Sequence, residues 1–437
     1  MMNKLTVLIL LCLFIIPGVG IAQHLSLQEA LQIGLEQNFG VQIAENEAEI
    51  DRMNRTLGNA GILPSINVTG TGERLFESET TEVTGESRST EDFEVSLLSL
   101  DAELDWTIFD GFRMFTTYSK LGEMKELGET LSRVQMEDTI VDIVTAYYEV
   151  VRQEKLLGVL ENSVEISEER YEIAQTKREL GSGSEYEELL AQSDLNRDRA
   201  EMIRQEVILN DARLELIRLL DLERGAEFDV TEGIDLAETV GFDELYDHFL
   251  ENNREIEAAE LRSSISNLEI RELRRERMPE IDFNLGYSLN REETQNNLLY
   301  LDQTDGLFVG ITARINIFDG FNTNRRVQTA KIRHKNNELR VREEQKNLET
   351  TLSSEYKNYE NARQLVELEN ENLRLAEEAL EIALEQFQLA TITSLELRET
   401  QRILFDTENN LIDAQFVAII SETELYRLAG ILNERLL

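Results

Sequence analysis

The chain has 437 residues with 86 acidic and 43 basic side chains, and its formal net charge of −43 makes nucleic acid and anionic lipid poor partners. Its one cysteine, Cys12, lies in an apolar N-terminal segment, so the rest of the chain has no thiol for a disulfide, a zinc site or a nucleophile. Only three prolines are present, which is typical of long uninterrupted elements.

Residues 1–22 are predicted to form a secretory signal peptide. Lys4 gives a positive start, Leu5–Ile16 is apolar but too short to cross a bilayer, and Gly20-Ile-Ala22 offers small residues for cleavage. The mature chain would begin at Gln23, and an uncleaved membrane anchor is the alternative. Beyond residue 22 there is no run of about 18 apolar residues, so no transmembrane helix is expected.

The remaining sequence is duplicated. Ile108–Phe112 and Ile317–Phe321 both read I-F-D-G-F, 209 positions apart, and Pro64 and Pro279 are 215 apart. A repeat of this length is a copied substructure and not a solenoid unit. We predict a first repeat over residues 23–221, a connector over 222–240, a second repeat over 241–430 and a C-terminal tail over 431–437.

Each repeat is predicted to run helix, strand, strand, helix, helix. The first helix spans about residues 27–59, with Ser26 and Glu29 as a capping box. Two proline-free stretches, 112–180 and 321–389, would form helices about 100 Å long at 1.5 Å per residue. Shorter helices are predicted over residues 185–220, 242–277 and 394–429. A 3-4-3-4 spacing indicates a coiled-coil seam through Leu373, Ala376, Leu380, Ala383 and Phe387.

The strands are predicted at about 64–76, 93–109, 279–290 and 305–318, with polar loops over 77–92 and 291–304. Apolar and polar side chains alternate along them, which indicates one dry face and one wet face. The polar set includes Asp101, Glu103, Asp105, Thr312, Arg314 and Asn316.

An apolar outside and a polar inside are typical of strands in a membrane β-barrel, with the polar residues lining the lumen. A soluble sheet packed on a helix is the alternative, but it would not normally gather three carboxylates on one face of one strand. Four strands cannot close a barrel, and open edges are not tolerated in lipid. Several chains would therefore have to combine their strands.

This whole-chain layout resembles the TolC-like family of outer-membrane efflux proteins. The resemblance rests on the duplicated element order, the two I-F-D-G-F strand exits, and the turns at Leu180-Gly-Ser182 and Leu389-Ala-Thr391. It implies an α+β membrane protein of the outer membrane, with an α-helical periplasmic tunnel and a twelve-stranded β-barrel shared by a homotrimer. It also implies partners, namely a periplasmic adaptor touching both turns and an inner-membrane pump of the RND or ABC type.

The resemblance further implies a periplasmic gate near the second turn, formed by Glu396 and Glu399, with Glu187 as the first-repeat counterpart of Glu396. The alternative is that these are ordinary solvated glutamates. Family members lock the closed state through a tyrosine and an arginine, but Phe387 and Ile392 stand at those positions and cannot form the same bonds. Ala390 also replaces the usual turn glycine, whereas Gly181 retains it.

An enzyme is not indicated. The three histidines form no motif, no known catalytic signature is present, and neither a cofactor nor a metal is expected. A non-transport coiled-coil structural protein is the main alternative, and a periplasmic adaptor lacks the strand-rich hairpin expected of that class. Drug efflux and type I protein secretion cannot be separated from these residues.

Overall fold

The computed structural model describes residues 23–436 except 79, 84–85, 90–92, 224, 227, 231–232, 234–240, 297 and 390. The expected signal peptide, most of the connector and Ala390 therefore lie outside the described residues. The chain divides into two compact units, which are described separately. Unit 1 contains residues up to 43, 134–253 and from 347 onward, and unit 2 contains residues 44–133 and 254–346.

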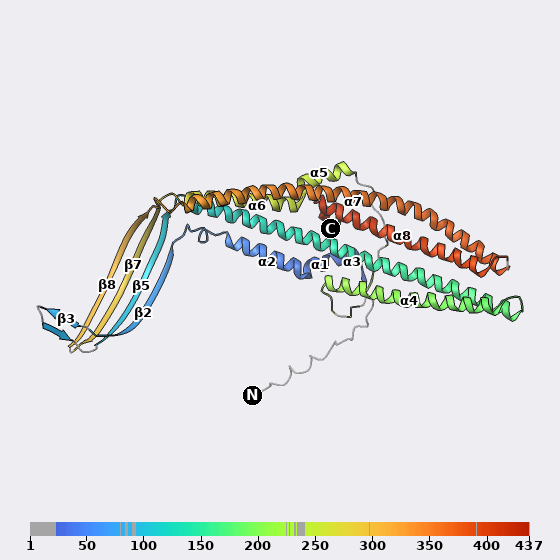
Figure 1. Cartoon of the computed structure of the whole chain (residues 1–437), viewed down its shortest axis with the longest axis horizontal. Coiled ribbons are helices and arrows are strands. Elements are labelled where there is room, and N and C mark those ends of the chain that lie inside the picture. Colours follow the sequence, from blue (N-terminus) through green and yellow to red (C-terminus); the bar gives the residue numbers. More distant parts are fainter. Residues whose placement is uncertain are drawn as a thin grey trace, which may run out of the picture. The chain divides into compact units, whose positions relative to one another are not determined.

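Unit 2 contains an antiparallel four-stranded sheet in the order β2-β5-β7-β8. Its strands, side by side in Figure 1, are β2 (Ser65–Glu77), β5 (Phe93–Phe109), β7 (Glu280–Asn296) and β8 (Leu298–Arg314). Two short strands, β3 (Thr80–Val83) and β4 (Glu86–Ser89), pair within the segment expected as a loop. In the described residues, the outer edges of β2 and β8 have no strand partner.

Two strand limits differ from the prediction. The segment 291–304 was expected as a polar loop, but β7 and β8 pair through it as far as Asn296 opposite Leu298. Much of it is polar on both faces, so the period-two signal fades although backbone pairing continues. At the other end β8 stops at Arg314, and Asn316 lies beyond the strand. Its partner β7 starts only after Pro279, which has no N–H to offer the ladder.

The helices follow the duplicated plan. In chain order they are α1 (Leu27–Gln37), α2 (Phe39–Asn54), α3 (Arg113–Glu179), α4 (Glu185–Leu219), α5 (Phe242–Asn252), α6 (Arg254–Arg275), α7 (Asn322–Gln388), α8 (Ser394–Leu428) and α9 (Leu432–Leu436). The long helices α3 and α7 both have 67 residues and contribute to both units. None of the described helices combines the length and apolar character needed to cross a membrane.

The first helix of each repeat is broken, which the sequence analysis missed. Asn38 separates α1 from α2, and Asn253 separates α5 from α6, both with an extended backbone. The Asn38 amide donates to the carbonyl of Leu219 (3.2 Å), and the Asn253 amide donates to the carbonyl of Leu428 (2.9 Å). An asparagine prefers such local backbone contacts to a helix interior, so it ends one helix and starts the next.

The core of unit 1 contains the predicted coiled-coil seam. Ala376, Leu380, Ala383 and Phe387 are buried in one cluster with Leu397 and Leu404 of α8, and Leu373 packs against it. The seam therefore joins α7 to α8, the hairpin shown in orange and red in Figure 1. Unit 1 also contains a small parallel pair, β1 (Gln23–Leu25) with β6 (Phe228–Val230), which connects the start of the first repeat to the connector.

Candidate functional site

The polar residues of the four strands share one face of the sheet. Residues directly opposite one another in antiparallel strands project to the same side. Asp105 lies opposite Ser65 on β2 and Asn284 on β7, and Thr312 lies opposite Asp282. The same alternation places Asp101, Glu103 and Arg314 on this polar face. Asn316 alone of the predicted lumen residues is outside the ladder.

Side-chain hydrogen bonds cross this face between strands. Asn284 donates to Asp105 Oδ1 (2.5 Å), and Thr107 donates to Asp282 Oδ1 (2.8 Å). The polar face is therefore a connected surface and not a set of isolated charges.

The opposite face of the sheet is apolar, and many of its described side chains are exposed. Its exposed side chains include Ile66, Val68, Leu98, Leu100, Leu307, Val309 and Ile311. A monomeric water-soluble protein rarely exposes so large an apolar surface. The sheet therefore has the two-faced character that a lipid-facing, water-lined wall requires.

The I-F-D-G-F motif is the turn that converts each second strand into a long helix. Gly111 and Phe112 both have positive φ angles (70° and 66°), as do Gly320 and Phe321 (67° and 63°). Asp110 Oδ2 accepts from the Met114 amide (2.8 Å), which caps the start of α3. In the second repeat Asp319 Oδ2 accepts from the Thr323 amide and hydroxyl (both 2.6 Å).

The two phenylalanines of each motif pack edge to face, with ring centroids 5.2 Å apart in the first repeat and 5.3 Å apart in the second. Phe112 and Phe321 are nonetheless more than half exposed. A non-glycine residue at positive φ is uncommon, and here the strain places an aromatic ring on the surface beside the strand end.

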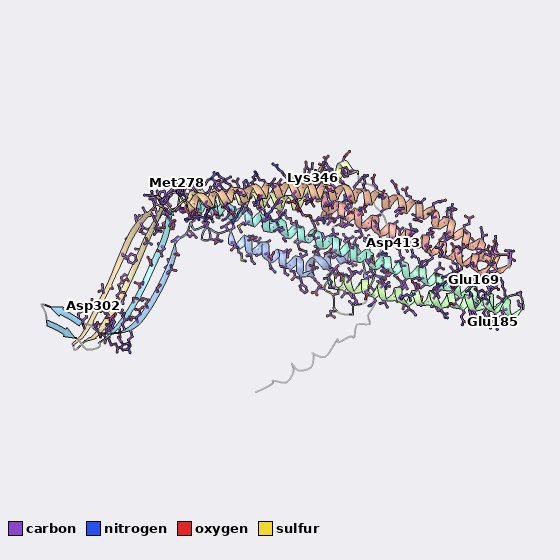
Figure 2. All side chains as sticks on the ribbon, viewed as in Figure 1. Glu169, Glu185, Met278, Asp302, Lys346 and Asp413 are labelled. Atoms are coloured by element: carbon purple, nitrogen blue, oxygen red, sulfur yellow. The ribbon has the colours of Figure 1, made fainter. Side chains whose placement is uncertain are left out.

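The two predicted turns, at the ends of α3 and α7, share a backbone hydrogen bond among their described residues. The amide of Ser182 donates to the carbonyl of Lys177 (2.9 Å), and the amide of Thr391 donates to that of Gln386 (2.9 Å). Leu180 and Leu389 are 78% and 75% exposed, so each turn presents a leucine to the surroundings. Glu169 and Glu185, labelled in Figure 2, lie on the two helices that meet at the first turn.

The predicted gate glutamates make local contacts. Glu187 and Glu396 are the third residues of α4 and α8, and each completes a capping box with Ser184 or Thr393. The Thr393 amide donates to Glu396 Oε2 (2.7 Å), and the amide and hydroxyl of Thr393 together lower the pKa of Glu396. Equivalent capping in both repeats is a structural role that the sequence analysis did not assign to these residues.

Glu399 is paired with Arg402, whose Nη2 donates to Glu399 Oε1 (2.6 Å). This bond lowers the pKa of Glu399 below its usual value. Both gate glutamates are therefore ionised at neutral pH, and both are exposed.

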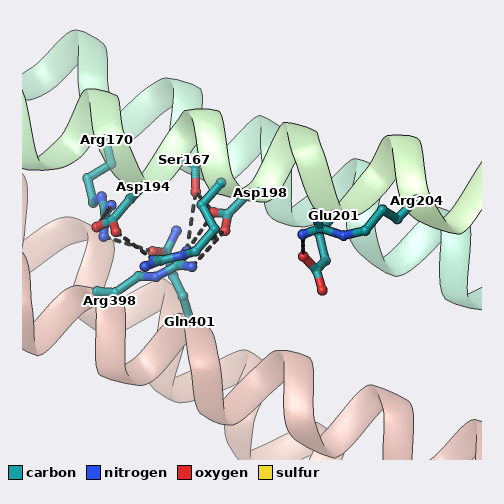
Figure 3. Close-up of polar contacts among 9 residues, drawn as sticks. Ser167, Arg170, Asp194, Asp198, Glu201, Arg204, Arg398 and Gln401 are labelled. Atoms are coloured by element: carbon teal, nitrogen blue, oxygen red, sulfur yellow. Dashed lines mark hydrogen bonds and ion pairs between the residues drawn. The ribbon is translucent and has the colours of Figure 1, made fainter.

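A buried ionic cluster, shown in Figure 3, joins α3, α4 and α8 of unit 1. Arg398 of α8 donates twice to Asp198 of α4 (2.6 and 2.7 Å), and Ser167 of α3 donates to the same carboxylate (2.5 Å). Arg170 is fully buried, forms an ion pair with Asp194, and donates to Gln401 (3.4 Å). Burial lowers the pKa of Arg170, and Asp194 opposes that shift.

Sequence reasoning did not identify this cluster, although a signal was present. Apolar stripes with spacings of three and four residues also run along α3 and α8. Ser167 lies in such a stripe between Val164 and Tyr171, and Gln401 lies in one between Leu397 and Leu404. Polar residues at seam positions are costly unless they are hydrogen-bonded, so they mark a specific contact.

Phe387 cannot form a side-chain hydrogen bond, but its backbone carbonyl accepts one from Lys177. The Lys177 ammonium donates to the Phe387 carbonyl (2.7 Å) and lies 3.9 Å from the centre of its ring. This contact joins α3 to α7 next to the turns, where a hydroxyl was expected in the family pattern. Among the described residues no group of three or more His, Cys, Asp or Glu side chains is placed to hold a metal ion.

Comparison with known proteins agrees with this architecture. A family model described as outer membrane efflux protein matches residues 30–221 and 245–431. The chain is 23% identical over 310 residues to the alkaline protease secretion protein AprF of Pseudomonas aeruginosa, covering 68% of this chain and 62% of that protein. It is 24% identical over 233 residues to protein CyaE of Bordetella pertussis, covering 52% of this chain and 48% of that protein.

The chain thus spans about half to just under two-thirds of the curated relatives it matches. Among solved structures, the CmeC outer membrane channel of Campylobacter jejuni superposes with a TM-score of 0.78 at 14% identity, covering 93% of this chain and 86% of that one.

These matches define the class of a two-repeat outer-membrane efflux protein with long helices and a strand domain. The chain belongs to the outer membrane efflux protein family, and the outer membrane is its location.

Proposed function

We propose that the chain is the exit duct of an export system, in which three copies share one twelve-stranded barrel. The observation that carries the proposal is the four-stranded sheet with two open edges, one polar face and one apolar face. In lipid an unpaired backbone group costs several kcal/mol, so β2 of one copy would pair with β8 of the next. Outer-membrane lipid would then contact the apolar face, and exported cargo would pass along the polar face.

The partners in this proposal are a periplasmic adaptor and an inner-membrane pump of the RND or ABC type. The exposed turns at Leu180-Gly181-Ser182 and Leu389-Ala390-Thr391 would contact the adaptor. The relative AprF is an alkaline protease secretion protein, which supports polypeptides as a cargo class beside small molecules. The duct would act by passage alone and not as an enzyme.

Glu396 and Glu399 form the proposed periplasmic gate, and their carboxylates would gather near the threefold axis of a trimer. Rings of ionised carboxylates favour cations over anions. Their mutual repulsion opposes closing, so helix packing must hold the closed state. The ionic cluster of Arg170, Asp194, Asp198 and Arg398 would contribute to this packing, because it joins α8 to α3 and α4.

Engineered cysteines would test the shared barrel, because the mature chain is expected to have none. Cysteine at Val68 on β2 would be combined in turn with cysteine at Leu307, Val309 or Ile311 on β8. A thiol crosslinker should then give covalent dimers and trimers for at least one pair. The control pair Val68 and Ala102 lies face to face within one chain and should crosslink only internally.

If every β2–β8 cysteine pair gave only monomers, and the protein carried no ion current in planar bilayers, the non-transport coiled-coil protein would be favoured instead. Native mass spectrometry in detergent gives an independent count of the chains per particle. A stable monomer that still crosses a bilayer would contradict the shared barrel.

A further inference from the structure

A groove of about 590 Å³ in unit 2 lies among α3, α6 and the first turns of α7. Five cationic side chains line it: Arg113, Lys120, Arg325, Arg326 and Arg333. Three glutamates line the same groove, so its formal charge is positive in a chain whose net charge is −43.

Two of these cations are not neutralised within the described chain. Lys120 forms an ion pair with Glu272 (2.6 Å), and Arg326 forms one with Glu276. The guanidinium groups of Arg325 and Arg333 have neither an ion pair nor a hydrogen bond among the residues that the structure describes. Two free guanidinium groups on one groove are a ready site for oxyanions, because guanidinium matches carboxylate and phosphate geometry.

The shared fold does not explain these charges. Residues 322–346 at the start of α7 have eight Lys or Arg against three Glu, whereas residues 347–388 have three against ten. The first-repeat positions equivalent to Arg325, Arg326 and Arg333 are Thr116, Thr117 and Met124. The same helix therefore folds in the first repeat without the cations.

An ion pair connects the groove to the polar face of the sheet. Arg113 Nη2 lies 3.5 Å from Glu280 Oε2, and Arg314 Nη1 lies 3.9 Å from Glu280 Oε1. Glu280 is opposite Arg314 in the ladder, on the face that also presents Asp282 and Thr312. Arg113, which lines the groove, thus also contacts a residue of the polar face of the sheet.

We propose that this groove is an anion-binding site inside the duct, which holds phosphate or carboxylate groups of cargo as they approach the barrel. The inference rests on the proposed duct, because only there does the polar face become a lumen. Three copies would give a ring of six free arginines in an otherwise acidic channel. Cargo with clustered oxyanions would then find a local attractive site after passing the acidic gate.

The test uses inorganic pyrophosphate as the probe. Single-channel current through the wild-type trimer should fall with increasing pyrophosphate, and Arg325→Gln with Arg333→Gln should raise the half-blocking concentration at least about tenfold. The matched control is Lys331→Gln with Lys335→Gln, which removes the same charge from the same helix outside the groove and should leave the midpoint unchanged. Citrate in place of pyrophosphate tests whether carboxylates bind as phosphates do.

Equal midpoints in the groove variant and the wild type would overturn the site. A loss of trimer in the groove variant, seen by native mass spectrometry, with pyrophosphate binding by calorimetry unchanged would assign the arginines to contacts with a neighbouring copy and also overturn it. Calorimetric titration of pyrophosphate into detergent-solubilised protein separates the two proposals. Binding that needs Arg325 and Arg333 in a protein that conducts no ions would reject the duct and retain the site, whereas conduction without such binding would do the reverse.

Discussion

Asn38 in the first repeat and Asn253 in the second interrupt their helices in the same way, and both donate to the carbonyl of a leucine near the end of α4 or α8. The Asp110 and Asp319 caps and the two positive-φ Gly-Phe pairs also agree between the repeats. Backbone geometry at turns is thus retained wherever the chain must change direction.

The charges on the helix faces differ between the same two repeats. Arg213 of α4 forms an ion pair with Glu154 of α3 (2.7 Å), whereas the equivalent second-repeat positions are Glu422 and Arg363. The buried ionic cluster has no duplicate, since Thr407 stands where Asp198 would recur and Leu189 where Arg398 would recur. The backbone turns are thus the same in the two repeats, whereas the buried ionic contacts differ where the two copies have diverged.

The largest effect is expected at the unduplicated cluster. Asp198→Ala leaves the Arg398 guanidinium without its carboxylate in a largely buried site, which should lower the free energy of unfolding by about 3–5 kcal/mol. Urea titration followed by helical circular dichroism measures this loss. Thr407→Ala at the equivalent position removes only a bond within its own helix and should cost no more than about 1.5 kcal/mol. Equal losses of unfolding free energy in Asp198→Ala and Thr407→Ala would show that the ionic cluster does not stabilise the first repeat more than a local hydrogen bond stabilises the second.

The second-largest effect is expected from substitutions on the two faces of the sheet, to which both repeats contribute strands. Leu104→Arg should destabilise the assembled barrel by about 2–4 kcal/mol near the bilayer midplane, because Leu104 lies on the apolar face. Glu103→Arg should leave assembly intact and shift ion selectivity toward anions. The fraction of trimer recovered from lipid vesicles measures the first, and reversal potentials measure the second. Identical behaviour of the two variants would contradict the facing assignment.

A smaller difference in stability is expected between substitutions at the two helix breaks, Asn38 and Asn253. Asn253 is buried and its hydrogen bond to Leu428 is shorter, whereas Asn38 is partly exposed. Asn253→Ala should therefore cost about 1–3 kcal/mol, the range for an unsatisfied buried carbonyl, and Asn38→Ala should cost less. Urea midpoints of the two variants provide the comparison, and a larger loss at Asn38 would show that burial is not the deciding factor.

Glu422, which stands at the second-repeat position equivalent to Arg213, should make the stability of the protein depend on pH. Burial raises the pKa of Glu422, although Tyr426 and Tyr359 donate to its Oε1 (3.2 and 3.3 Å). The native state therefore holds the proton to higher pH than the unfolded chain, so stability falls as pH rises from the ordinary carboxyl value to the raised one. Glu422→Gln should flatten that fall.

Glu396→Gln is the comparator for this pH experiment. The pKa of Glu396 is lowered, so its contribution is present above the ordinary carboxyl value and is lost as pH decreases through the lowered one. The two variants should change the pH profile in opposite directions, and changes of the same sign would contradict these assignments.

The smallest effect is expected at the gate. Divalent cations added on the periplasmic side should block current, and Glu396→Ala with Glu399→Ala should relieve the block while changing open conductance little. Planar-bilayer recording decides this. Glu187→Ala, in the first-repeat counterpart, shows whether one repeat or both contribute. An unchanged block in all variants would leave Glu187 and Glu396 as helix caps and Glu399 as the ion-pair partner of Arg402.

The repeat was readable from matching motifs 209 and 215 positions apart, and the long helices and the face pattern of the strands were readable from the sequence because each depends on local periodicity. Ser26 with Glu29 was correctly predicted as a capping box for the same reason. The breaks at Asn38 and Asn253 were missed because they depend on a carbonyl about 180 residues away. The paired segment 291–304 was missed because its polar and apolar residues do not alternate, so backbone pairing leaves no period-two pattern there.

The candidate site was less predictable than the fold. Alternation identified the polar strand residues, but Asn316 was assigned to a strand whose partner had already ended. The ionic cluster needs three helices brought together, and Ser167 and Gln401 were visible only as gaps in two apolar seams. The groove at Arg325 and Arg333 is likewise formed by three elements distant in sequence, so charge alone could not locate it.

The unpaired edges of β2 and β8 have a consequence for how the protein is made. Before it assembles, a single chain in water exposes two unpaired strand edges and an apolar sheet surface. Unpaired edges readily form hydrogen bonds with strands of other proteins. Productive maturation must then compete with aggregation, and its rate should depend steeply on the local supply of fresh chains. Chaperone capacity in the periplasm, more than the stability of the finished particle, would set the yield of working channels.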